Sequence, residues 1–177
     1  MTKNLFIEIT GFIRSVQHVQ EDLLLEIWDG KDEQHVTYLV IHKLAIITTL
    51  TGEPIYVSHE HVGCYIVAFV NNRKPILAMY PSRFYPELVA VRNDDQFGYV
   101  QVGKFNEELM SEELNLKLIV SEETDIINYV GETLTIDEIY NHYMFVYYNG
   151  STRSIPAQAA VKKVIVYDDP FGQMKDQ

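Results

Sequence analysis

The chain has 177 residues, enough for one ordinary domain or two small ones whose cores need no disulfides. Its formal net charge of −11 argues against nucleic acid and against an anionic membrane surface as partners, because both need clustered Lys and Arg. The single cysteine, Cys64, excludes an intramolecular disulfide and a cysteine-based zinc site.

Runs of strand-forming residues, separated by turn residues, predict many short strands. In chain order these runs are 5–16, 23–30, 35–42, 64–72, 87–94, 97–102, 114–120, 143–150 and 161–169. Helical character is confined to residues 105–114 and 135–140, where Thr135 and Glu138 have the spacing of a capping box. The sequence therefore predicts an all-β fold, made of small OB-like barrels or curled antiparallel sheets with one or two short helical turns.

The two halves of the chain correspond to each other. The matching stretches are Gly52-Glu53 with Gly131-Glu132, "CYIVAF" from Cys64 with "HYMFVY" from His142, and "YPSR" from Tyr80 with "IPAQ" from Ile155. We infer one duplicated unit, with a first β-barrel repeat over residues 1–93 and a second over residues 94–177. The first repeat has an additional hairpin at 18–34.

A proline-containing segment precedes the last predicted strand of each repeat, with Pro81 in the first and Pro156 in the second. Because proline has no backbone N–H, this segment should be a sheet edge or a connection. We expect Arg153 and Ser154 to hold the second turn by hydrogen bonds. The alternative is that the segment forms the mouth of a binding groove.

The stretch "STRSIPAQAAVKKVIV", preceded by "GETLTIDEI" and "FVYY", resembles a β-rich repeat of uncharacterised proteins of Gram-positive bacteria. Those repeats carry a turn similar to Thr-Arg-Ser-Ile-Pro-Pro-Gln, which corresponds here to Thr152–Gln158 with Ala157 in place of the second proline. Some of them lie beside segments similar to the N-terminal part of copper amine oxidases, in secreted or envelope proteins. The resemblance implies a small β domain without known catalytic residues.

The first twelve residues contain neither a signal peptide nor a membrane span, so we expect a cytoplasmic protein, although related repeats can be secreted.

The stretch His59-Glu60-His61 is a candidate metal site. On a strand, His59 and His61 would share a face and could ligate one ion. A third ligand would come from His35, His42 or Glu53. The alternative is an exposed turn.

Acidic residues are concentrated in the second half. Residues 1–93 carry 8 basic and 10 acidic side chains, whereas residues 94–177 carry 6 and 15. The calcium-loop spacing is missing, so a solvated surface is expected, with a basic protein partner or calcium as the alternatives.

Motifs of hydrolases, zinc proteases, phosphate loops and nucleotide sites are missing, so we expect no enzyme and no cofactor. The expected function is a non-catalytic binding or scaffold protein with a protein partner. The alternatives are a small-ligand or glycan binder with a Tyr-rich surface, and a metal-linked accessory protein that uses His59 and His61 or the acidic clusters. The candidate binding residues flank the two prolines and are Tyr80, Arg83, Tyr85, Thr152, Arg153 and Gln158.

Overall fold

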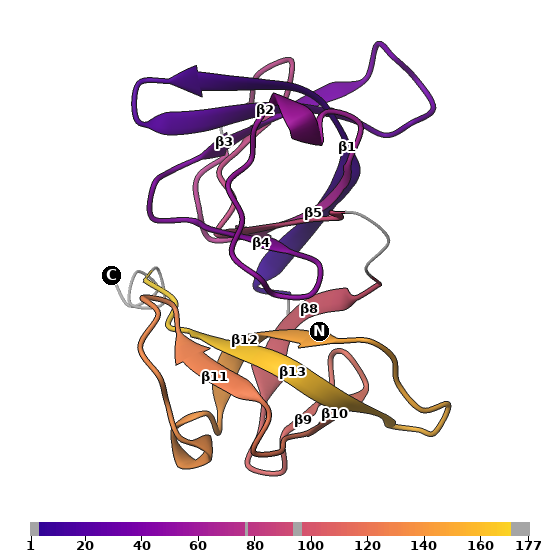
Figure 1. Cartoon of the computed structure of the whole chain (residues 1–177), viewed down its shortest axis with the longest axis vertical. Coiled ribbons are helices and arrows are strands. Elements are labelled where there is room, and N and C mark those ends of the chain that lie inside the picture. Colours follow the sequence, from indigo (N-terminus) through magenta and orange to yellow (C-terminus); the bar gives the residue numbers. More distant parts are fainter. Residues whose placement is uncertain (1–3, 77, 94–96, 171–177) are drawn as a thin grey trace. The chain divides into compact units, whose positions relative to one another are not determined.

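The computed structural model describes residues 4–76, 78–93 and 97–170. These residues form strands, loops and two short 3-10 turns, so the predicted all-β fold class is confirmed. The chain divides into two compact units, each with its own sheet (Figure 1). We call Leu5–Gln96 the N-terminal unit, and Phe97–Gln177 together with Met1–Asn4 the C-terminal unit. Within the described residues, no helix is long and apolar enough to cross a membrane.

The N-terminal unit contains one curled sheet. Its strands are β1 (Phe6–Val19), β2 (Asp22–Trp28), β3 (Val36–Ile41), β4 (Ile46–Thr49), β5 (Tyr65–Asn71), β6 (Arg83–Phe84) and β7 (Leu88–Val91). Their order in the sheet is β4-β7-β5-β1-β2-β3-β6. Only residues 85–87 separate β6, at one end of this order, from β7 near the other end. So short a connection requires the sheet to curl back on itself.

The C-terminal unit repeats this arrangement with fewer and shorter hairpin strands. Its strands are β8 (Tyr99–Phe105), β9 (Met110–Ser111), β10 (Leu116–Ile119), β11 (Asp125–Asn128), β12 (His142–Tyr148) and β13 (Ala157–Tyr167). Their order is β8-β12-β13-β10-β9, and β11 also pairs with β13. Strand β13 takes the place of both β6 and β7. In the N-terminal unit Pro86 lies between those two strands and lacks the N–H that a continuous ladder needs.

Equivalent strands of the two units pair in the same register. Four cross-strand pairs of the N-terminal unit have counterparts in the C-terminal unit. Phe12–Tyr65 corresponds to Lys104–Tyr143, Ile66–Val91 to Met144–Val166, Ile47–Val89 to Ile126–Val164, and Leu39–Phe84 to Leu118–Ala159. The last two sets are parallel pairs, a feature that the sequence analysis, with its antiparallel sheets, did not foresee. The structural repeat therefore extends to individual residues.

The Gly-Glu turn that first indicated the repeat has the same construction in both units. Gly52 and Gly131 have φ angles of 94° and 91°, which a residue with a side chain rarely adopts. In the first unit Thr49 Oγ1 accepts the N–H of the glutamate that follows the glycine (3.2 Å), and in the second Asn128 Oδ1 does so (2.9 Å). A glycine and a short polar side chain thus end β4 and β11 in the same way.

The 3-10 turns also occupy equivalent positions. The turn η2 (Ile136–Glu138) confirms the predicted capping box, since the Glu138 carboxylate accepts the backbone N–H of Thr135 at 2.7 Å. The expected helical character at 105–114 is wrong: this segment forms a turn and then β9. Asn106 Oδ1 accepts the N–H groups of Glu108 (2.9 Å) and Met110 (3.1 Å), and such local bonds compete with a helix.

Each unit has its own hydrophobic core on the concave side of its sheet. The inward residues of the N-terminal unit include Ile13, Leu25, Leu39, Ile66 and Val91, and those of the C-terminal unit include Phe105, Leu118, Met144, Val146 and Val166. Equivalent strands bury equivalent residues, so the residues that remain on the outer faces can differ between the units without loss of the core.

Candidate functional site

Two loops contain three of the six candidate binding residues that the sequence analysis selected, Tyr80, Thr152 and Arg153, and the other three lie just after the loops. The first proline loop, residues 72–82, joins β5 to β6, and the second proline loop, residues 149–156, joins β12 to β13. The Tyr80–Pro81 and Ile155–Pro156 peptide bonds, at equivalent repeat positions, are both cis. The loops belong to different units, and each is described on its own.

The residue before each proline is unusually exposed. Tyr80 is 80% exposed and Ile155 is 88% exposed, the two highest values among the large apolar side chains of the described residues. An exposed apolar side chain is common on protein surfaces, but its recurrence at one repeat position is informative. Both loops present an apolar side chain that their own unit does not cover.

Lys74 anchors the first proline loop to the body of its unit. Its ammonium group donates to the Tyr85 carbonyl at 2.9 Å and forms an ion pair with the Glu87 carboxylate. The two charged side chains are only 20% and 11% exposed, so little water competes with this contact. The loop therefore leaves its sheet at a defined point.

The other candidate residues of the N-terminal unit have neighbours within it. The Arg83 guanidinium lies over the Tyr38 ring, 5.7 Å from its centroid. The Tyr85 ring stacks on His42 with centroids 5.7 Å apart. Each contact uses a ring face or a cation that a ligand would need. The Tyr80 hydroxyl donates to the Gln34 carbonyl at 3.4 Å, but the Tyr80 side chain remains 80% exposed.

A chain of hydrogen bonds braces the second proline loop. Thr152 Oγ1 accepts the N–H of Gln158 (2.9 Å), and the Thr152 N–H donates to the Gln158 carbonyl (2.9 Å). The Ser154 hydroxyl donates to the Pro156 carbonyl (2.9 Å), so the Thr152 hydroxyl must donate in the 2.6 Å contact between the two hydroxyls. The polar groups of Thr152 serve the loop itself.

Arg153 differs from the expectation. Ser154 holds the turn as predicted, but Arg153 is exposed and makes no hydrogen bond or ion pair with any residue that the structure describes. Its guanidinium group is free to meet a ligand beside Ile155.

His59-Glu60-His61 form the 3-10 turn η1 (His59–His61), so the alternative of a turn is confirmed and the two histidines do not share a strand face. His61 Nδ1 accepts the backbone N–H of Ser58 at 3.1 Å and so closes a capping box. Of the suggested third ligands, His35 contacts Asp32 (2.6 Å) and His42 contacts Asp22 (2.9 Å). Across the described residues no group of three or more His, Cys, Asp or Glu side chains could hold a metal ion.

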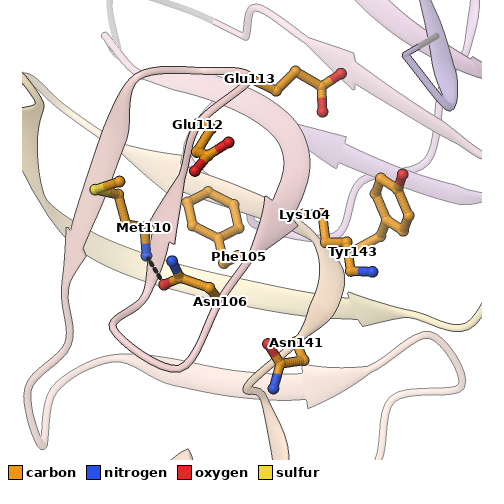
Figure 2. A pocket seen from close by; sticks show the side chains of 8 residues that line it. All are labelled: Lys104, Phe105, Asn106, Met110, Glu112, Glu113, Asn141 and Tyr143. Atoms are coloured by element: carbon orange, nitrogen blue, oxygen red, sulfur yellow. Dashed lines mark hydrogen bonds between the residues drawn. The ribbon is translucent and has the colours of Figure 1, made fainter. Parts of the chain in front are cut away.

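A pocket of about 260 Å³ in the C-terminal unit was not foreseen. Figure 2 shows the Phe105 ring at its centre, with Lys104 and Tyr143 on one side and Met110 on the other. The remaining lining residues are polar and are Asn106, Glu112, Glu113 and Asn141. Six of its eight lining residues lie between 104 and 113, and the pairing of β8 with β12 adds Asn141 and Tyr143, which no sequence motif could indicate.

The described groups with displaced pKa values do not converge on a reaction centre. Backbone N–H groups of residues in the same turn lower the pKa of Asp29 and of Asp32, which are both on the surface. Burial, and to a smaller extent the neighbouring Tyr99, raises the pKa of Tyr148. These shifts follow from local structure rather than from a catalytic arrangement.

No protein-family model, no curated protein and no solved structure matches the chain. The assignment of function therefore depends on the geometry of the chain.

Proposed function

We propose that this chain is a non-catalytic binding protein that holds a protein partner through its two proline loops. The observation that carries this proposal is the exposure of Tyr80 and Ile155 at the same repeat position, 80% and 88% respectively. Two copies of one unit, each with an uncovered apolar side chain on a braced loop, present two contact points of the same kind.

The energetics favour contact residues of this type. Burying an aromatic or aliphatic side chain fully against a partner contributes about 1.5–3 kcal/mol, and hydrogen-bonded loops reduce the entropy lost on binding. The ion pair of Lys74 in the first loop and the hydroxyl chain of Thr152 and Ser154 in the second provide such restraint. Arg153 would add a charged contact beside Ile155.

Strand β12, whose Tyr-rich sequence suggested the glycan alternative, gives that alternative little support. Phe145 and Tyr147 on β12 are 0% and 1% exposed, so their rings pack in the core and offer no stacking surface. The metal-linked alternative loses the shared strand face of His59 and His61. A protein partner therefore remains the better supported proposal.

The experiment compares matched surface variants of the tagged full-length chain. Tyr80→Ser, Ile155→Ser and the double variant remove the loop side chains. Leu44→Ser and Val130→Ser remove apolar side chains that are 78% and 77% exposed elsewhere in each unit. Proteins retained from an extract of the source cells are quantified by mass spectrometry.

We expect the double variant to lose at least one protein that the wild type and both control variants retain. The single variants should show which loop contributes more. Equal retention by all variants would contradict the assignment of the loops as the contact site. Loss from the control variants as well would indicate non-specific apolar adsorption.

A further inference from the structure

Three aromatic rings and a guanidinium group form a row across the outer face of the N-terminal unit. Phe12 on β1 pairs with Trp28 on β2 on one side and with Tyr65 on β5 on the other. The ring centroids of Phe12 lie 6.5 Å from Trp28 and 5.6 Å from Tyr65. Arg92, directly after β7, lies over the Tyr65 ring at 5.3 Å. We call these four residues the aromatic row.

The rings of this row are held in place by the sheet. Gly30 lies so close to Phe12 that a Cβ atom there would be 3.0 Å from the ring. Phe12 is tilted by 51° to Trp28 and by 66° to Tyr65. The rings thus stand at angles to each other and form ridges with furrows between them, rather than one flat platform.

The polar atoms of the aromatic row have no partners within the described chain. Neither Trp28 Nε1 nor the Tyr65 hydroxyl has a hydrogen bond, and neither atom is among the buried unpaired ones. Arg92 is exposed and has no carboxylate partner among these residues. The row therefore offers three accessible hydrogen-bond donors and a positive charge beside apolar rings.

The fold does not require aromatic residues at these positions, as the C-terminal unit shows. There Lys104 and Tyr143 occupy the places of Phe12 and Tyr65, by the matched strand register. Glu112, directly after β9, lines the same pocket as Lys104 and Tyr143 (Figure 2). One unit keeps its core with a charged pocket where the other has the aromatic row. The aromatic row is thus available for a function of its own.

The ligand that fits is rich in acceptors and poor in donors. A polyproline II segment has this character, because its carbonyl groups are unpaired and its prolines lack N–H groups. Proline rings pack between aromatic side chains, and a Trp or Tyr donor binds the exposed carbonyls. The unpaired Arg92 at the end of the row suits a carboxylate of the same peptide.

Other ligands with aromatic contacts fit less well. Glycan hydroxyls need acceptors as well as donors, and sugar rings stack best on flat ring faces, which the tilt of Phe12 interrupts. Single-stranded nucleic acid needs a positively charged groove. Residues 1–93 carry 8 basic and 10 acidic side chains, so this unit provides no such groove.

We propose that the aromatic row of the N-terminal unit binds an extended, proline-rich peptide that carries a carboxylate, which Arg92 receives. This proposal uses no residue of the proline loops and does not depend on the function proposed for them.

The test uses Trp28, the only tryptophan of the chain, as a built-in reporter. An acetylated oligoproline of about nine residues that ends in aspartate is titrated into the full-length protein, and tryptophan emission is followed together with calorimetry. We expect a saturable blue shift, since the peptide covers a partly exposed indole. Peptide lacking the aspartate should bind about fivefold more weakly.

Variants locate the binding. Phe12→Lys, which copies the residue of the equivalent position in the C-terminal unit, should weaken binding at least about tenfold. Arg92→Gln should abolish the difference between the two peptides. Tyr143→Leu in the C-terminal unit is the matched control and should bind as the wild type does. The double loop variant with Tyr80→Ser and Ile155→Ser should also bind normally, which separates this site from the function proposed for the loops.

The proposal is overturned if neither calorimetry nor emission shows binding at about 1 mM peptide. It is also overturned if the folded Phe12→Lys variant, checked by circular dichroism, binds with unchanged affinity. Oligothymidine and a cello-oligosaccharide are titrated in parallel. If one of them shifts the tryptophan emission and the peptide does not, the proposed peptide ligand is wrong and that ligand class takes its place.

Discussion

Gly11 and Gly103 occupy the same repeat position, and alanine at each gives a matched test of the packing. A Cβ atom at Gly11 would lie 2.7 Å from the carbonyl oxygen of Trp28, which belongs to the β1–β2 ladder. At Gly103 it would meet the end of the Leu114 side chain at 2.8 Å and Ser111 Oγ at 3.0 Å. Backbone can yield only by shifting a strand, whereas a leucine tip can rotate.

The two substitutions should therefore differ in cost. Overpacking that forces a backbone shift costs about 1–3 kcal/mol. Replacing glycine by alanine also stabilises the protein by about 0.4–1 kcal/mol, because the unfolded chain loses conformational entropy. The clash at Gly11 is with backbone, so we take an overpacking cost of about 3 kcal/mol; after the gain from the unfolded chain, Gly11→Ala should lower the free energy of unfolding by about 2 kcal/mol. Gly103→Ala should cost less than about 1 kcal/mol, since Leu114 is only partly buried.

Urea unfolding measures both effects. Emission from Trp28 reports on the N-terminal unit, and far-ultraviolet circular dichroism reports on both units. With a slope of about 1–2 kcal/mol per molar urea, Gly11→Ala should lower the midpoint by about 1–2 M. If Gly103→Ala costs as much as Gly11→Ala, or Gly11→Ala costs nothing, the reasoning from backbone contact is wrong.

Three further predictions concern single interactions. Lys74→Met removes the ion pair with Glu87 and should lower the free energy of unfolding in urea by about 3 kcal/mol. The double variant with Glu87→Leu should recover most of this loss; an equal loss in both variants would refute the ion pair as the cause. Tyr148 has a pKa raised by burial and by a neighbouring tyrosine, so its stabilising contribution should be full below pH about 10 and fall as the pH rises further. An absorbance titration should show late ionisation that decreases in Tyr148→Phe; an unchanged titration curve would contradict this. Thr152→Val should speed amide exchange at Gln158 by about fivefold, as expected for a lost bond of about 1 kcal/mol, and unchanged exchange would show that the hydroxyl does not brace the loop.

Features that depend on nearby residues could be predicted from the sequence. The capping box of Thr135 and Glu138 is a local pattern, and it forms as expected. The glycine turns at Gly52 and Gly131 are equally local, which explains why they revealed the repeat. Alternation of apolar residues predicted the longer strands, because burial on one face imposes a period of two residues.

Features that depend on distant residues could not be predicted. Strands β4 and β11 have four residues each, and they form because β7 and β13 pair with them in parallel. His59-Glu60-His61 alternates like a strand, but the cap at Ser58 turns it into η1. The aromatic row brings Phe12, Trp28 and Tyr65 together only when the strand register is known, so no motif could have indicated it.

The position of the last strand in each unit has a consequence for folding during synthesis. Strand β7 lies between β4 and β5, and β13 joins β12 to both β10 and β11, so in each sheet the strand made last pairs with strands on both of its edges. Neither core can close until that strand has left the ribosome. Until then, the apolar residues of every earlier strand of the unit stay in contact with water. High contact order of this kind slows folding. Because synthesis runs from the N-terminus, the N-terminal unit can complete its fold before the C-terminal unit begins to fold.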